Sequence, residues 1–157
     1  MTFRLGRLAA AVVALTAFFG IVGVAQSHPH IFIDARGEVL FADGRATGMR
    51  HHWTFDPYFS AWAIQGLDTD DDGVLTPTEL QPLAEENLIG LEFYDFYTFP
   101  EDPEGLVPVA GARDPSMVYE DGELTLTFTV DFESPVTVGR GFDIEVADPE
   151  YYAAFTF

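Results

Sequence analysis

The chain has 157 residues, of which 26 are acidic and 7 are basic, and its formal net charge is −19 at pH 7. Such a charge repels nucleic acid and anionic lipid and attracts cations, which argues against a role on a phosphate backbone. The absence of cysteine excludes disulfides and thiolate ligands, while an aromatic content of 15% indicates a packed core rather than a disordered chain.

Residues 1–27 are predicted to form a secretory signal peptide. Two arginines give a short basic start, an apolar run follows at residues 8–25, and small residues end the segment. Cleavage after either Ala25 or Ser27 fits this pattern. An uncleaved membrane anchor is the competing interpretation, because the apolar run is about long enough to span a bilayer. We expect an exported protein, periplasmic or secreted, with no stable membrane insertion after signal removal.

The mature chain, residues 28–157, is predicted to be a single periplasmic β-rich domain. Alternating apolar residues predict strands at residues 31–41 and 46–55, joined by the hairpin turn Ala42-Asp43-Gly44-Arg45. Five further segments are predicted to be strands, at residues 92–99, 117–120, 123–132, 142–147 and 151–157. A loop is expected at residues 100–111, and a hairpin turn at Asp121-Gly122. The fold class is therefore predicted to be α+β, a mainly antiparallel sandwich-like domain with a helical insertion at about residues 57–90.

The predicted insertion contains an acidic stretch, Asp68 to Glu79, that matches the EF-hand calcium loop. Carboxylates stand at loop positions 1, 3, 5 and 12, with Gly73 at the sharp turn. A cation of the size of calcium takes about six to eight oxygen ligands and tolerates irregular geometry. The expected ligands are Asp68, Asp70, Asp72, the Val74 carbonyl, Thr76 (directly or through water) and Glu79.

Helices are expected on both sides of this loop. Asp56 and Pro57 end the preceding strand and cap a helix at residues 58–67, and Pro77 opens a second helix at residues 78 to about 88. The alternative interpretation is an acidic surface turn without an ion, in which the carboxylates would repel one another. EF-hands normally pair, but the sequence contains no second loop of this kind. A calcium staple that holds an inserted helix pair is therefore favoured over a switch that opens a groove.

The four histidines fall in two pairs, His28 with His30 and His51 with His52. We expect the register of the first hairpin to bring His51 or His52 level with the chain start, where imidazoles would suit Ni²⁺, Cu²⁺, Co²⁺ or Zn²⁺. Cleavage after Ser27 would add the free amine of His28, and cleavage after Ala25 would instead supply an amine and amide nitrogens. The alternative is that the terminal pair is a frayed polar end and the strand pair is structural.

No catalytic motif is recognisable, and we expect no enzyme. The sequence has no Gly-x-Ser-x-Gly elbow, no His-Glu-x-x-His, no phosphate loop and no nucleophilic cysteine. Carboxylate pairs such as Asp143 with Glu145 are expected by chance among 26 acidic residues, and they are more often a solvated strand face. The best enzymatic alternative is a copper oxygenase that uses an N-terminal histidine.

Several segments resemble an uncharacterised bacterial periplasmic family, domain of unknown function 1007, over nearly the whole mature chain. They are HPHIFIDA at residues 28–35, RHHWTFD at 50–56, AIQGLD at 63–68 and DPEYYAAF at 148–155. The family is described as a periplasmic component of an uncharacterised ABC-type transport system, and its members tend to accompany nickel/cobalt-type exporters or permeases. Members often extend beyond this last segment. Either the apolar end at Phe157 is tied into the sheet, or the sequence is a truncated version of something longer.

The resemblance implies a role in divalent-metal handling. The first expectation is an exported calcium-binding accessory protein of a divalent-metal transport system, with a membrane metal permease or exporter as partner and transition-metal binding through the histidines. The alternative expectation is a calcium-stabilised periplasmic interaction module that binds no transition metal and in which the histidines are structural.

Overall fold

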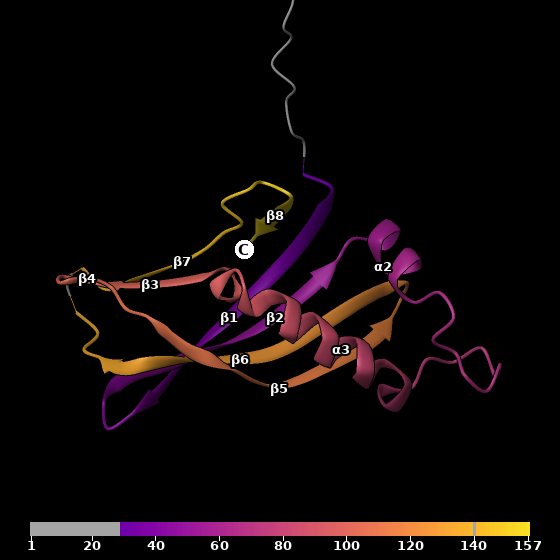
Figure 1. Cartoon of the computed structure of the whole chain (residues 1–157), viewed down its shortest axis with the longest axis horizontal. Helices are drawn as coiled ribbons and strands as arrows, with labels where there is room; N and C mark the ends of the chain where they lie inside the picture. Colours follow the sequence, from indigo (N-terminus) through magenta and orange to yellow (C-terminus); the bar gives the residue numbers. More distant parts are fainter. Residues whose placement is uncertain (1–28, 140) are drawn as a thin grey trace, which may run out of the picture.

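The computed structural model in Figure 1 describes residues 29–139 and 141–157. The predicted signal peptide and His28 lie outside the described residues. The strands are β1 (Ile31–Ala42), β2 (Arg45–Phe55), β3 (Thr98–Asp102), β4 (Gly105–Leu106), β5 (Val109–Glu120), β6 (Glu123–Val136), β7 (Asp143–Val146) and β8 (Ala153–Thr156). Between β2 and β3 lie two α-helices and a short 3₁₀ helix, which are α2 (Pro57–Ala63), α3 (Pro77–Glu92) and η1 (Asp95–Tyr97).

The strands form two sheets. The larger sheet has the order β5-β6-β2-β1-β8 and the smaller has the order β4-β3-β7. Neighbouring strands run antiparallel except β1 and β8, which are parallel. A hydrophobic cluster that includes Val107 and Phe132, with Ile144 packed against it, joins one end of the larger sheet to the smaller one. The predicted α+β class with mainly antiparallel strands is therefore confirmed.

The main core lies between the larger sheet and α3, which crosses that sheet in Figure 1. Strand alternation points the buried side chains of Trp53, Phe55 and Phe128 to this face. The helix contributes buried residues that are one turn apart, because positions four residues apart share a helix face. These residues are Leu80, Ala84 and Leu88.

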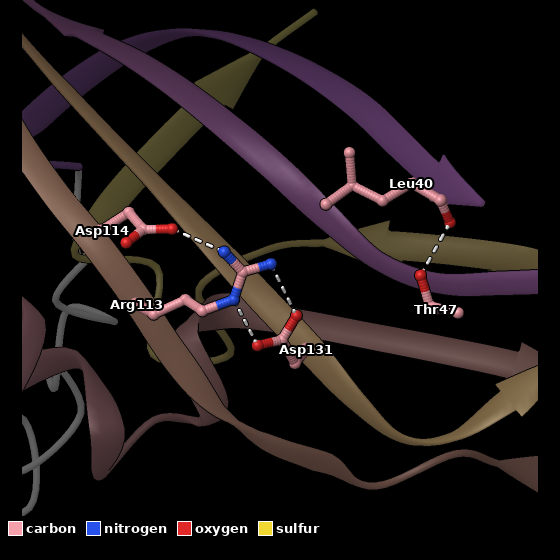
Figure 2. Close-up of polar contacts among 5 residues, drawn as sticks. All are labelled: Leu40, Thr47, Arg113, Asp114 and Asp131. Atoms are coloured by element: carbon pink, nitrogen blue, oxygen red, sulfur yellow. Dashed lines mark hydrogen bonds and ion pairs between the residues drawn. The ribbon is translucent and has the colours of Figure 1, made fainter. Parts of the chain in front are cut away.

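Both predicted two-residue hairpins are confirmed. Asp43 and Gly44 have φ angles of 51° and 76°, and Asp121 and Gly122 have φ angles of 52° and 88°. Positive φ at both central residues gives the twist that a tight antiparallel hairpin needs, and Asp-Gly adopts it readily. In the first hairpin the pairing slips by one residue after Leu40, whose carbonyl accepts a hydrogen bond from the Thr47 hydroxyl at 3.3 Å (Figure 2).

The predicted strand at residues 92–99 is wrong. The second helix continues to Glu92, and the aromatic segment that follows turns through η1, where three successive residues have φ near 50°. Burial explains the difference, because the turn places Phe96 in the core, and tertiary packing outweighs the β propensity of aromatic residues. A strand begins only at Thr98. The predicted loop at residues 100–111 also contains strand residues of β3, β4 and β5.

The two longer helices flank the acidic loop as predicted, although their lengths differ from the prediction. The first ends at Ala63, and the chain then turns through Gly66 with a φ of 77°. The Asp56 carboxylate caps it by accepting hydrogen bonds from the backbone N–H groups of Tyr58 and Phe59. No helix among residues 29–139 and 141–157 is long and apolar enough to cross a membrane.

Candidate metal centre

Three carboxylates converge in the loop between α2 and α3. Asp68, Asp70 and Glu79 each offer an oxygen, and these oxygens lie within 4.8 Å of one another. In the part of the chain that the structure describes, this is the one group of three or more acidic, histidine or cysteine side chains so arranged. Asp72, a further predicted ligand, is exposed and lies outside the converging group, and Val74 is also exposed.

Backbone N–H groups hold the loop around its first carboxylate. Asp68 accepts hydrogen bonds from the N–H of Asp72 at 3.2 Å and from the N–H of Gly73 at 2.9 Å. Asp70 accepts a further one from Asp72 at 3.3 Å. Positive φ angles at Asp71 (58°) and Gly73 (81°) provide the curvature. These contacts fold the loop so that Asp68 and Asp70 present oxygens to the same place.

Glu79 brings the far end of the loop to the same place. One carboxylate oxygen accepts hydrogen bonds from the N–H and the hydroxyl of Thr69, both at 2.8 Å. The other accepts from the N–H of Thr76 at 3.0 Å and from its hydroxyl at 2.8 Å. The backbone N–H groups of Thr76 and Thr69 lower the pKa of Glu79 to about 2, so the carboxylate is ionised at neutral pH.

The same contacts start α3. Thr76 is the N-cap residue, its hydroxyl accepts from the N–H of Glu79, and the Glu79 side chain reaches back to the N–H of Thr76. This reciprocal arrangement is a capping box. Sequence reasoning did not use the Thr-x-x-Glu spacing that signals it, and it missed Thr69, which carries no such signal.

The donor set fits calcium. Every ligand offered by the loop is an oxygen. Oxygen donors suit a hard cation such as calcium better than they suit a transition metal, which favours nitrogen or sulfur donors. Bonds of about 2.3 to 2.6 Å let one calcium ion bridge oxygens on opposite sides that are about 5 Å apart. The spacing of the three carboxylates is within that span. Glu79 would exchange some of its contacts with Thr69 and Thr76 for the ion, because its oxygens already accept four hydrogen bonds.

His51 lies in the core with 0% of its surface exposed. Its ring stacks on Phe128 at 4.9 Å between centroids and meets the edge of Trp53 at 5.4 Å. Nε2 is 3.0 Å from the hydroxyl of Thr98, which donates its proton to the Phe96 carbonyl, so Nε2 is the donor in this pair. Burial, with a smaller contribution from the neighbouring His52, lowers the pKa of His51 to about 4.

The other described histidines point elsewhere. His52 follows His51 in the strand and therefore faces the opposite side of the sheet, where its Nδ1 is 3.1 Å from the Thr127 hydroxyl. His30 lies near the chain start, with its ring centroid 5.0 Å from that of Tyr152.

The expected register between the histidine pairs is wrong. His51 pairs with Gly37, and His52 pairs with Arg36. The separation of His30 and Arg36 along the strand is about 20 Å at about 3.3 Å per residue. His30, His51 and His52 therefore do not share a site, and His28 lies outside the described residues.

Comparison with known proteins gives one match. A family model described as "Protein of unknown function (DUF1007)" matches residues 13–157. No curated protein and no solved structure matches the chain.

Proposed function

The chain belongs to the DUF1007 family, and because the family description gives no function, we propose from the acidic loop that it is a calcium-stabilised interaction domain. The observation that carries this proposal is the convergence of Asp68, Asp70 and Glu79 within 4.8 Å. The ion would contact these carboxylates first, with Asp72, the Val74 carbonyl and Thr76 completing the oxygen set.

Calcium would act as a staple between two parts of the chain. Asp68 follows α2, whereas Glu79 belongs to the first turn of α3, so an ion held by both joins the two ends of the loop. Calcium supplies the positive charge that offsets repulsion among the carboxylates. The unfolded chain does not hold these oxygens together, so binding favours the folded state.

Transition-metal binding through the histidines is not part of this proposal, because His30, His51 and His52 lie apart. An accessory role beside a membrane metal permease or exporter stays a prediction from the family resemblance. The calcium loop would serve that role as well as any other, since it stabilises the domain rather than selecting a cargo.

Thermal unfolding tests the proposal. The protein is first freed of calcium with a chelator and then unfolded with and without calcium, at matched ionic strength and with magnesium as a second control. Saturating calcium, at about 100 times Kd, should add about 2.7 kcal/mol to the free energy of unfolding. Magnesium should add less, because it demands near-octahedral geometry.

Variants locate the effect. Asp68→Ala and Glu79→Ala should abolish the calcium-dependent gain, whereas Asp143→Ala, at an exposed acidic residue of β7, should keep it. The same melting temperature with and without calcium in the parent protein would sink the proposal. An equal gain from magnesium would reduce the effect to charge screening and would also contradict it.

A further inference from the structure

A groove runs between α3 and β5, beside the buried face of the helix. Glu85, Ile89 and Glu92 are spaced so that they form one stripe along α3, adjacent to the buried stripe that contains Leu88. Together with residues of β5, this stripe lines a hollow of about 420 Å³. The helix therefore presents a second, exposed surface next to the one that packs on the sheet.

The floor of the groove is apolar. Leu88 and Phe96 line it from the helical side, and Ala112 and Pro115 line it from β5. Ile89 stands at its border with 73% of its surface exposed. Leu88 and Phe96 are themselves buried, whereas the exposed Ile89 offers a contact for an apolar side chain of a partner.

A hydrogen bond ties α3 to β5 near the start of the helix, and an exposed aromatic side chain follows the end of the helix. The Gln81 side-chain amide donates to the Glu85 carboxylate at 3.0 Å and to the Pro115 carbonyl at 3.2 Å, and so ties the helix to the strand. At the opposite end, Phe93 follows the last turn of the helix with 86% of its surface exposed. The apolar surface thus extends beyond the hollow itself.

The rim is acidic and has no basic partner in its lining. Glu85 and Glu92 lie on the border, and no lysine or arginine is among the residues that line the hollow. The basic residue of β5, Arg113, is engaged elsewhere. Figure 2 shows Arg113 between Asp131 and Asp114. Its guanidinium nitrogens lie 2.7 and 3.2 Å from the Asp131 carboxylate oxygens and 2.5 Å from an Asp114 oxygen. The charge on the rim is therefore available to a partner.

We propose that the groove docks a cationic amphipathic segment of a partner protein. Its apolar side chains would cover Leu88 and Ile89, and its basic side chains would face Glu85 and Glu92. Charge argues against the other occupants. A second copy of this chain carries a net charge of −19 and no lysine, and an anionic lipid surface is repelled in the same way. The proposal rests on the proposed function of an interaction domain, but it does not require that the domain binds calcium.

The test uses a fluorescently labelled synthetic leucine–lysine peptide that forms an amphipathic helix, titrated with the protein and followed by anisotropy. Ile89→Lys should weaken binding about tenfold or more, because it places a like charge where the apolar side chains of the peptide would pack. The double change Glu85→Gln and Glu92→Gln should weaken it less. Leu106→Lys is the matched control, since Leu106 on β4 is 66% exposed and lies outside the groove. It should bind as the parent does.

Three outcomes would overturn the proposal. An equal loss in Leu106→Lys would mean general attraction to the acidic surface, and no saturable binding would mean no such site. A parent dimer that Ile89→Lys converts to a monomer would make a second copy the occupant.

The titration is run with and without calcium. Groove-dependent binding in both conditions supports the docking proposal even where the thermal test of calcium fails, so the two proposals can fail separately.

Discussion

The acidic loop and the core around His51 place polar side chains in opposite environments, one open to solvent and the other fully buried. In the loop, Asp70 is exposed and Glu79 is half-buried, and their oxygens accept hydrogen bonds from nearby N–H and hydroxyl groups. His51 is fully buried with the rings of Phe128 and Trp53 against it, and its Nδ1 has no hydrogen-bond partner among the described residues. The loop can exchange hydrogen bonds for a cation at its surface. His51 can accept a proton or a metal ion only if the core opens.

The largest expected effect is acid destabilisation through His51. Its pKa is lowered from 6.5 to about 4 in the folded protein, so between these values the unfolded chain binds more protons than the folded one. The contribution of neutral His51 to the free energy of unfolding is fully present above pH 6.5 and is lost as the pH falls towards 4. We expect a loss of about 3 kcal/mol in the free energy of unfolding over this window, measured by urea unfolding in the presence of a chelator.

His51→Leu should remove most of this pH dependence, whereas His30→Ala, at an exposed position, should not. The contributions of Glu79, whose pKa is lowered from 4.5 to about 2, and of Asp56, whose pKa is also lowered, are lost mainly below pH 4.5 and touch only the acidic end of this window. A parent protein that is as stable at pH 4 as at pH 7 would show that the core accommodates the imidazolium.

A smaller effect is expected from the hydroxyl that holds His51. Thr98→Val preserves shape but leaves Nε2–H of His51 and the Phe96 carbonyl without their partner. Leaving buried polar groups unpaired should lower the free energy of unfolding by about 2 kcal/mol at pH 7. Thr98→Ser, which keeps the hydroxyl, should recover most of the loss. A Thr98→Val variant as stable as the parent would show that the hydroxyl does not contribute, and equal destabilisation by both variants would mean that the methyl group matters as much as the hydroxyl.

The smallest of these effects concerns the loop. Thr76→Ala removes the hydroxyl that caps α3 and should lower the calcium-free stability by about 1 kcal/mol. Thr78→Ala, at the neighbouring exposed position inside the helix, is the control and should change little. The two variants are compared by chemical unfolding in chelator. A Thr76 variant as stable as the parent would mean that the capping box contributes nothing to the free protein.

The loop could be predicted from the sequence because its geometry is local. Asp68 and Glu79 are eleven positions apart in one continuous segment, and Gly73 fixes the turn between them. The hairpins were predictable for the same reason, since Asp-Gly selects the turn and the turn selects the pairing. Three of the expected ligands converge, while Asp72 lies outside that group.

The histidine arrangement could not be predicted because it depends on register and on distant packing. A shift of one residue moves a side chain to the other face of a sheet, and the first hairpin contains such a shift after Leu40. The partner of His51 is Thr98, 47 residues away, and nothing in the sequence marks the pair. The aromatic segment around Phe96 has the β propensity of a strand. Its actual course depends on the packing of Phe96 in the core with residues of α3, which the local sequence does not reveal.

The most direct test of calcium binding is a calorimetric titration of the calcium-free protein with calcium at constant ionic strength. We predict one saturable site with a Kd at or below about 10⁻³ M, the upper end of the range for extracellular calcium modules. The heat should be lost in Glu79→Ala and kept in Asp143→Ala. A titration without saturable heat, or one that the Glu79 variant leaves unchanged, would show that the converging carboxylates do not hold calcium.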